Sequence, residues 1–178
     1  MKNLFIVFSF FCFGLYGQNV FIPYDSLEPN AKVFAVHDGD SYKVLIDGLI
    51  SKKWIRVYGV DCPEVISNRI SKDQPYGRLI ADSVRAMLKG KIVRIDSLSV
   101  DMFDRTVAKV YLNNVSMTDL LISKGWAWFW RDENMLEDER IYLESLQNNA
   151  REKGYGFWGL PEPNVLPHVW RGRNKRRF

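Results

Sequence analysis

Histidine and cysteine are scarce in this sequence: its 178 residues include two of each. His37 and His168 are far apart along the chain, and Cys12 lies in an apolar run near the N-terminus, so the Cys/His spacing of a zinc site is absent. If that run is removed, Cys62 is the one cysteine left and no internal disulfide can form. Stability must therefore come from packing and from any ion that the fold binds.

The apolar run at the N-terminus is too short to cross a membrane. It extends over about residues 4–13, whereas a helix needs roughly 20 apolar residues to span a bilayer. Lys2 precedes the run and Gly14 and Gly17 follow it, which is the layout of a secretory signal peptide. We predict a signal peptide at residues 1–17 and a secreted or periplasmic protein without stable membrane association after cleavage; an uncleaved anchor is the alternative.

The sequence also has no internal repeat and no low-complexity block. Hydrophobic residues make up 47% of the chain and aromatic residues 14%, which supplies one well-packed core in a chain too short for two full domains. We therefore predict an N-terminal segment at residues 18–30, one compact domain at residues 31–160 and a basic tail at residues 161–178. The tail is either a disordered, solvated end or a segment that attracts nucleic acid electrostatically.

The hydrophobic pattern alternates between strand and helix character along the domain. Short runs of β-branched and aromatic residues, broken by Asp-Gly turns, indicate strands, and apolar residues at helical spacing indicate helices. Ser116 and Asp119 form a capping-box-like start for one helix, and Gly125 ends it. The expected elements are strands at 32–36, 41–46 and 53–60, a helix at 76–90, strands at 91–95 and 106–112 separated by a polar loop at 96–104, and helices at 117–124 and 135–153.

This order of elements defines the expected fold class. Five short strands with an inserted helix are typical of a small closed or partly open barrel of the oligonucleotide-binding type, the OB-fold. We predict an α+β, mainly β fold: a five-stranded OB-fold-type barrel with three helices.

Two short stretches place acids next to strand ends. In "HDGDSYKV", Asp38 and Asp40 lie at a hairpin, and taken alone this stretch is a turn. In "RVYGVDCPE", Arg56 lies in a strand, and Asp61 and Glu64 follow its end. Taken alone, this second stretch is a solvated strand exit.

Together the two stretches predict a site for a cation. If the hairpin pairs the two strands, Asp40 and Asp61 converge at one edge of the sheet and offer oxygen ligands suited to a hard divalent ion. Two carboxylates at such a short distance repel each other unless a cation lies between them. A cation beside arginines is an arrangement that handles phosphate, for which Arg56 and Arg105 are candidates. For Arg105, an exposed arginine at a strand start is the alternative.

The motifs of the domain, taken in order, carry a family resemblance. They are "VHDGDSYKV", "RVYGVDCPE", "PYGRLIADSV", "DMFDRTVAKVYL", "SKGWAW" and "EKGYGFW". In this order and spacing they resemble the staphylococcal nuclease (thermonuclease) family, over about residues 32–158, and the tail "PNVLPHVWRGR" is similar to that of bacterial relatives. The resemblance implies an OB-fold-type barrel and calcium-dependent hydrolysis of DNA and RNA phosphodiester bonds. We expect a monomer that cleaves with little sequence preference.

The resemblance also implies which residues bind the ion. Carried over by position, Asp40 and Asp61 would bind one calcium ion through their carboxylates, and Cys62 would add its backbone carbonyl. Asp38 would support the ion from nearby. The Cys62 thiol itself is not predicted to be a nucleophile, because the sequence suggests no histidine near it.

The remaining roles implied by the resemblance concern the substrate. Arg56 and Arg105 would hold the scissile phosphate and stabilise its developing charge, and Glu64 would orient or deprotonate the attacking water. A catalytically inactive OB-fold module that binds nucleic acid is the competing hypothesis. An enzyme that uses magnesium or manganese is a third, because carboxylates and a carbonyl do not select calcium by themselves.

Overall fold

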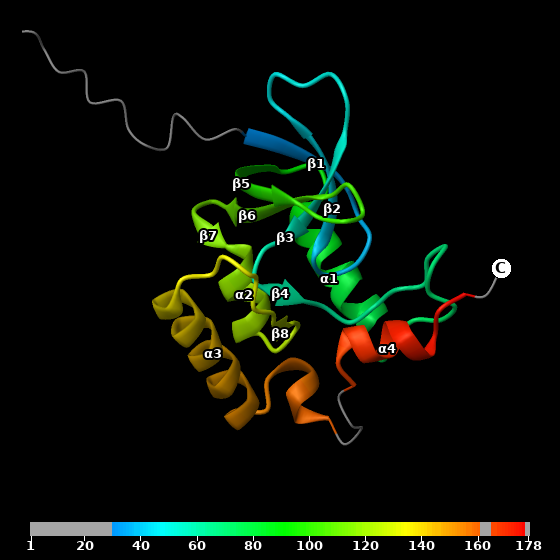
Figure 1. Ribbon diagram of the computed structural model, residues 1–178, viewed down its shortest axis with the longest axis vertical. Coiled ribbons are helices and arrows are strands. Elements are labelled where there is room, and N and C mark those ends of the chain that lie inside the picture. Colours follow the sequence, from blue (N-terminus) through cyan, green and yellow to red (C-terminus); the bar gives the residue numbers. More distant parts are fainter. Residues whose placement is uncertain (1–29, 161–164, 177–178) are drawn as a thin grey trace, which may run out of the picture.

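The structure is a computed structural model that describes residues 30–160 and 165–176 (Figure 1). The predicted signal peptide lies outside the described residues, so its prediction stays untested. The elements in chain order are β1 (Asn30–Val36), β2 (Ser41–Ile46), β3 (Lys53–Val57), β4 (Val60–Asp61), α1 (Gly77–Leu88), β5 (Ile92–Val100), β6 (Thr106–Leu112), β7 (Val115–Ser116), α2 (Met117–Ser123), β8 (Trp128–Phe129), α3 (Glu137–Glu152), the 3-10 helix η2 (Gly156–Gly159) and α4 (Pro167–Arg173).

Five strands close into a barrel, which confirms the predicted fold class. The main sheet has the order β3-β2-β1-β5-β6-β7, and β6 also pairs with β3. That closing pair is parallel, with Ile55 opposite Thr106, while the other neighbours are antiparallel. The register shifts once within β1 and once within β5, and such bulges bend strands enough to help a small barrel close.

The core lies inside the barrel and between the barrel and its helices. Alternate residues of the strands point inward, as the period of two in the sequence predicts. The buried set of the barrel includes Val33, Tyr42, Val44, Ile55, Val57, Val93, Ile95, Ala108 and Val110. Helix α1 contributes Ile80, Ala81, Val84 and Leu88 from one face, the face that the helical spacing predicts.

The helices α2 and α3 lie together below the barrel in the view of Figure 1. Helix α2 begins as predicted, because Ser116 accepts a hydrogen bond from the backbone N–H of Asp119 at 3.2 Å. Aromatic rings fill the space beside α3: Trp128 stacks on Phe157 with ring centroids 4.1 Å apart. Core packing is therefore the role of these two rings.

Three sequence predictions need correction. The described residues contain four α-helices rather than three, because α4 forms at residues 167–173. The predicted strand at 53–60 is two strands, since Gly59 turns the chain with a φ of 78°, a conformation that glycine adopts without strain. The predicted loop at 96–104 is wrong for residues 96–100, which extend β5 along β6.

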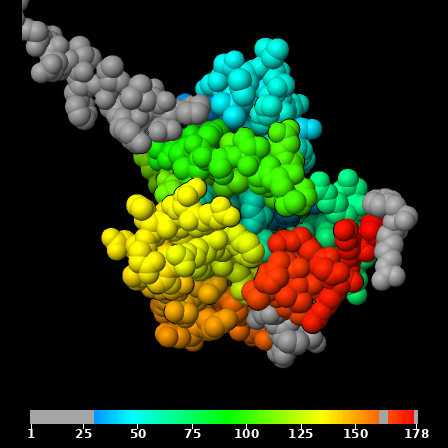
Figure 2. Space-filling model, in the orientation of Figure 1, coloured from blue at the N-terminus to red at the C-terminus, as the bar shows by residue number. Residues whose placement is uncertain are grey.

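The C-terminal residues that the structure describes pack against the domain. Figure 2 shows α4, in red, as part of the same surface as the residues that follow β4. A backbone bridge joins Ile70 to Lys175. The hypothesis of a disordered end therefore fails for residues 165–176. Across the described residues, no helix combines the length and the apolar character needed to cross a membrane.

Candidate active site

The start of β2, the end of β3 and the strand β4 bring three of the predicted site residues together. Ser41 lies opposite Arg56 in the β2–β3 register, so Asp40 directly precedes that pair. The backbone N–H of Val57 donates to the carbonyl of Asp40 at 2.9 Å. Asp61 ends the short strand β4, which pairs with β8. The β2–β3 pairing places Asp40 beside Arg56, and β4 brings Asp61 to the same place, so the two aspartates converge as the sequence predicts.

One guanidinium lies against both aspartates. Arg56 Nη1 is 3.7 Å from Asp40 Oδ2, and Arg56 Nη2 is 3.4 Å from Asp61 Oδ1. Nη2 also donates to the backbone carbonyl of Val60 at 3.0 Å. Both aspartates are almost inaccessible, at 3% for Asp40 and 1% for Asp61. Burial disfavours the charge of Arg56, but the two carboxylates outweigh that effect and raise its pKa above the usual value.

Cys62 contributes through its backbone. Its N–H donates to Asp40 Oδ2 at 2.9 Å, which ties the loop after β4 to the start of β2. Gly39 makes this approach possible, because a Cβ at that position would lie 2.5 Å from Cys62 Sγ. The thiol is buried, and burial together with the nearby Asp40 raises its pKa well above the usual value. Such a thiol is a poor nucleophile.

If the chain cleaves nucleic acid as its motifs imply, we expect the variant Cys62→Thr to cleave at the wild-type rate. The substitution leaves the backbone N–H and carbonyl in place and should lower the free energy of unfolding by about 1 kcal/mol. Initial rates of nucleic-acid cleavage and urea melts of the two proteins check this expectation. A folded but inactive Cys62→Thr protein would show that the thiol takes part in the chemistry.

Arg105 reaches the same site through a serine. Its Nη1 donates to Ser41 Oγ at 3.0 Å, and Ser41 Oγ donates to Asp40 Oδ1 at 3.0 Å. Asp101 fixes the other side of the guanidinium, with Arg105 Nε donating to Asp101 Oδ2 at 2.8 Å. Burial works against the charge of Asp101, yet hydrogen bonds from Arg105 and Phe103 lower its pKa. These contacts fix the orientation of the Arg105 guanidinium. The sequence prediction missed Ser41, which connects Arg105 to Asp40.

Glu64 is positioned by Gln74 and by the start of α1. Its backbone N–H donates to Gln74 Oε1 at 3.1 Å, and its carbonyl accepts from the Gln74 N–H at 2.8 Å. A Cβ on Gly77 would lie 2.2 Å from that carbonyl oxygen, so only glycine fits there. Burial raises the pKa of Glu64 to about 7, against an opposing effect of Arg171.

Asp38 lies against the backbone of Asp40. Its Oδ1 accepts a hydrogen bond from the backbone N–H of Asp40 at 3.2 Å, and the residue is 7% exposed. Burial, followed by repulsion from Asp40 and Glu64, raises the pKa of Asp38 well above its usual value. This arrangement supports the loop that holds Asp40.

Arg171 of α4 is a site residue that the sequence prediction missed. Its guanidinium donates to Asp61 Oδ1 at 3.0 Å and to Asp61 Oδ2 at 3.1 Å, and Nη1 also donates to Glu64 Oε1 at 2.5 Å. A signal was present in the sequence, because Pro167 is typical of a first helical turn. The arginines that follow it would then lie on an ordered element rather than in a tail.

The chain offers a cation few protein ligands. Among residues 30–160 and 165–176, no three His, Cys, Asp or Glu side chains form a group that could hold a metal ion. Asp40 and Asp61 both contact the Arg56 guanidinium, and their side chains offer only oxygen atoms as ligands. This donor chemistry fits a hard ion such as calcium or magnesium, with backbone oxygen, water or substrate completing the ligand shell.

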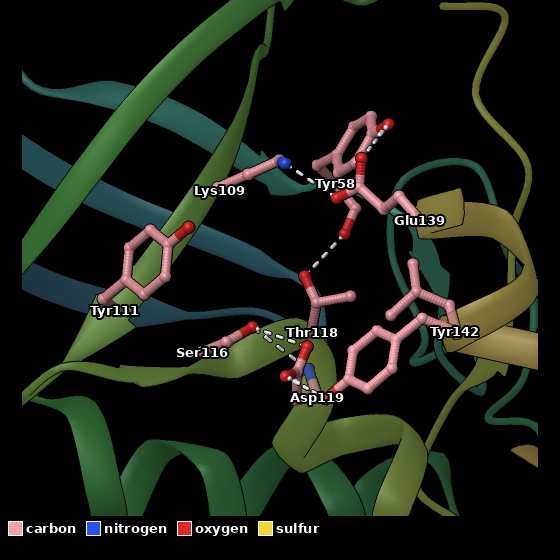
Figure 3. Close-up of a pocket in the computed structure, with 9 residues that line it drawn as sticks. Tyr58, Lys109, Tyr111, Ser116, Thr118, Asp119, Glu139 and Tyr142 are labelled. Atoms are coloured by element: carbon pink, nitrogen blue, oxygen red, sulfur yellow. Dashed lines mark hydrogen bonds and ion pairs between the residues drawn. The ribbon is translucent and has the colours of Figure 1, made fainter. Parts of the chain in front are cut away.

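A concave region lies apart from these residues, between β6, α2 and α3 (Figure 3). Its polar groups are joined to one another: Lys109 pairs with Glu139 at 2.7 Å, and the hydroxyl of Tyr142 donates to Asp119 at 2.8 Å. None of the predicted site residues lines it. The first pair connects α3 to β6 of the barrel and the second connects α3 to α2, which is a structural role.

The fold and the site define a class of protein. A five-stranded OB-type barrel that gathers carboxylates and arginines at one end has an arrangement of side chains that can bind a phosphate group. The family model described as "Staphylococcal nuclease homologue" matches residues 54–159, which is more than half of the chain. The chain therefore belongs to the staphylococcal nuclease homologue family. Arg56, Asp61, Glu64 and Arg105 lie within the matched range.

Several curated proteins are similar to this chain. Staphylococcal-like nuclease CAN1 of Arabidopsis thaliana is 31% identical over 129 residues, which is 72% of this chain and 36% of the relative. An uncharacterized endonuclease of Escherichia coli is 29% identical over 145 residues, covering 81% of this chain and 86% of the relative. An uncharacterized endonuclease of Haemophilus influenzae is 29% identical over 144 residues, 81% of this chain and 74% of the relative. The chain thus spans about a third of the plant relative and most of the bacterial ones.

Proposed function

We propose that this protein is a calcium-dependent endonuclease that hydrolyses phosphodiester bonds of DNA and RNA with little sequence preference. The observation that carries the proposal is the convergence of Asp40, Asp61 and Arg56, with Arg105 joined to them through Ser41. The names of the relatives, nuclease and endonuclease, support the same class of reaction.

The two predicted catalytic arginines address the main obstacle to the reaction. A phosphodiester carries a negative charge that repels an attacking water or hydroxide. Arg56 and Arg105 are fixed by carboxylates and by Ser41 before any substrate binds, so they need little reorganisation to accept the charge that develops in the transition state. Guanidinium groups also match phosphate oxygens in a bidentate geometry.

Glu64 is the group on this chain suited to the attacking water. Its backbone is fixed on both sides by Gln74, and its carboxylate faces the same space as Asp61, since Arg171 touches both. A carboxylate in this place can orient a water and accept its proton. When bound between Asp40 and Asp61, a divalent cation would polarise a phosphoryl oxygen and help to neutralise the developing charge.

The competing function is an inactive barrel that binds nucleic acid. A binding module does not need Asp40, Asp61, Glu64, Arg56 and Arg105 together, nor the fixed geometry around Glu64. The organisation of these side chains is therefore the reason to prefer an enzyme.

The proposal is tested by incubating the purified mature protein with single- and double-stranded DNA and RNA in calcium, magnesium or a chelator. We expect cleavage of both nucleic acids in calcium and none in the chelator. Cleavage in magnesium alone would replace calcium with magnesium in the proposal. Binding without cleavage in every metal would establish the inactive module instead.

We further propose that the protein acts as a monomer outside the cytoplasm. The support for the location is the signal-peptide pattern of residues 1–17, and extracellular modules often bind calcium at roughly 0.1 to 1 mM. Expression of the full chain with a C-terminal tag tests this: the tagged protein should appear in the periplasm or medium with a mass that lacks the first residues. A full-length, membrane-bound product would establish the anchor instead.

A further inference from the structure

The C-terminal segment 165–176 is anchored beside the candidate active site. In Figure 1, α4 lies next to the chain that leaves β4. The segment is hydrogen-bonded to residues 69–74 along its length. The bonds run from Gln74 Nε2 to the Val165 carbonyl, from Trp170 Nε1 to the Lys72 carbonyl, from the Ser71 N–H to the Asn174 carbonyl, and from the Arg176 N–H to the Arg69 carbonyl. Gln74, the last residue of this stretch, also forms hydrogen bonds with Glu64. Residues 69–74 therefore support both α4 and Glu64.

This support directs one side chain of α4 into the site. Arg171 donates to both carboxylate oxygens of Asp61 and to Glu64. The Arg171 side chain is 35% exposed, whereas that of Asp61 is 2% exposed. The Arg171 side chain therefore contacts a buried carboxylate while part of it remains accessible to solvent at the rim of the site.

The charges explain why an arginine lies there. Asp61 and Glu64 are largely removed from water, and a buried carboxylate without a partner is costly. Among the described residues, Arg56 is shared between Asp40 and Asp61 and makes no hydrogen bond or ion pair with Glu64. Arg171 supplies the additional positive charge, in a bidentate geometry that is strong and specific.

The same position makes Arg171 sensitive to a divalent cation. A cation held by Asp61 would lie close to the Arg171 guanidinium, and two like charges at such a short distance repel each other even near a protein surface. Binding of the cation would therefore weaken the Arg171–Asp61 pair, whereas the less exposed Arg56 is also held by the Val60 carbonyl. Because the Arg171 side chain reaches solvent, it can turn toward a phosphate at the rim without unfolding α4.

We propose that Arg171 is a third arginine of the active site, which neutralises Asp61 and Glu64 until a divalent cation binds and then binds a phosphate of the nucleic acid. This inference rests on the proposed nuclease function. It adds a substrate-binding residue from the C-terminal segment to the two predicted arginines.

Calcium binding without nucleic acid tests the first half of this proposal. Isothermal titration calorimetry is carried out on the wild type, Arg171→Ala, Arg171→Lys and Arg173→Ala. Arg173 is the matched control, because it is exposed on the same helix and two residues turn a helix by about 200°. We expect Arg171→Ala to bind calcium about 10-fold more tightly than the wild type, and Arg173→Ala to match the wild type. Equal affinity of Arg171→Ala and wild type would overturn the proposal.

Steady-state cleavage of a labelled oligothymidylate at saturating calcium tests the second half. Loss of one charge-assisted contact with phosphate should raise KM about 10-fold in Arg171→Ala. Arg171→Lys should lie between Arg171→Ala and the wild type, because lysine keeps the charge but not the bidentate geometry. An unchanged KM and kcat in Arg171→Ala would overturn the phosphate-binding role.

The same experiments separate this inference from the proposed function. If the wild type neither binds calcium nor cleaves, the proposed function fails. If the wild type does both and Arg171→Ala equals it in both, only the role of Arg171 fails. Should Arg171→Ala not fold, Arg171→Lys decides: wild-type calcium affinity together with wild-type KM and kcat would contradict the proposal.

Discussion

Replacing Arg56 with alanine should lower the rate of phosphodiester cleavage by on the order of 100-fold to 1,000-fold. Arg56 is the guanidinium that lies against both Asp40 and Asp61, so it is fixed where a phosphate would meet the carboxylate site. The loss should appear in kcat, because the interaction strengthens as charge develops in the transition state. Initial rates at saturating calcium and several substrate concentrations measure it.

The same substitution should also destabilise the protein, and this effect needs its own control. Removing one partner of a buried ion pair typically lowers the free energy of unfolding by about 3 kcal/mol or more. Without the Arg56 guanidinium, two buried carboxylates lose a partner. We expect the melting temperature of Arg56→Ala to fall in chelator and to recover partly in calcium, because the ion replaces the lost charge. Near-normal turnover of the folded variant would exclude Arg56 from the mechanism.

Arg105→Ala should produce a rate loss of the same order, 100-fold to 1,000-fold, with a smaller change in stability. The Arg105 side chain is 22% exposed and its main partner, Asp101, is 17% exposed, so solvent can compensate much of the lost pair. Rates and urea melts of the same preparations separate the two effects.

Arg78→Ala is the matched control for Arg105→Ala. Arg78 pairs with Asp73 on the surface at 3.1 Å, and its side chain is 48% exposed, so its removal should leave the cleavage rate unchanged. Asp101→Asn adds a second comparison, because it weakens the hold on Arg105 while the guanidinium stays. Its rate should lie between those of the wild type and Arg105→Ala. If Arg105→Ala cleaves as fast as Arg78→Ala, Arg105 is only the exposed strand-start arginine of the alternative hypothesis.

Most of the fold could be predicted from the sequence because the strands of the barrel alternate inward and outward side chains. The strand formed by residues 96–100 could not be predicted in this way. In the structure they pair with β6, for instance Ser97 with Ala108, but residues 97–100 are exposed. A strand without a buried face leaves no hydrophobic period in the sequence.

The candidate site was predictable where its residues lie close to a hairpin. The Asp-Gly turn and the β2–β3 register bring Asp40 near Arg56 and Asp61, and these contacts are local in sequence. Arg171 could not be found in this way, because it lies 110 residues from Asp61 along the chain. Its contact depends on how residues 165–176 dock on residues 69–74, which composition does not reveal.

The missed residues change the view of the site. The sequence indicates two arginines and a separate basic tail, which is either a disordered end or a segment that attracts nucleic acid electrostatically. In the structure, Arg171 from that tail contacts Asp61, and Ser41 connects Arg105 to Asp40. The site therefore depends on the C-terminal segment as well as on the barrel.

The central claim is that the carboxylates at this end of the barrel hold a cation on which phosphodiester cleavage depends. The most direct test is the initial rate at which the wild type and Asp61→Asn cleave a labelled single-stranded DNA, in calcium and in chelator. We predict cleavage by the wild type in calcium, none in chelator, and a loss on the order of 100-fold or more for Asp61→Asn in calcium. Undiminished cleavage by the wild type in chelator, or by folded Asp61→Asn in calcium, would contradict the account.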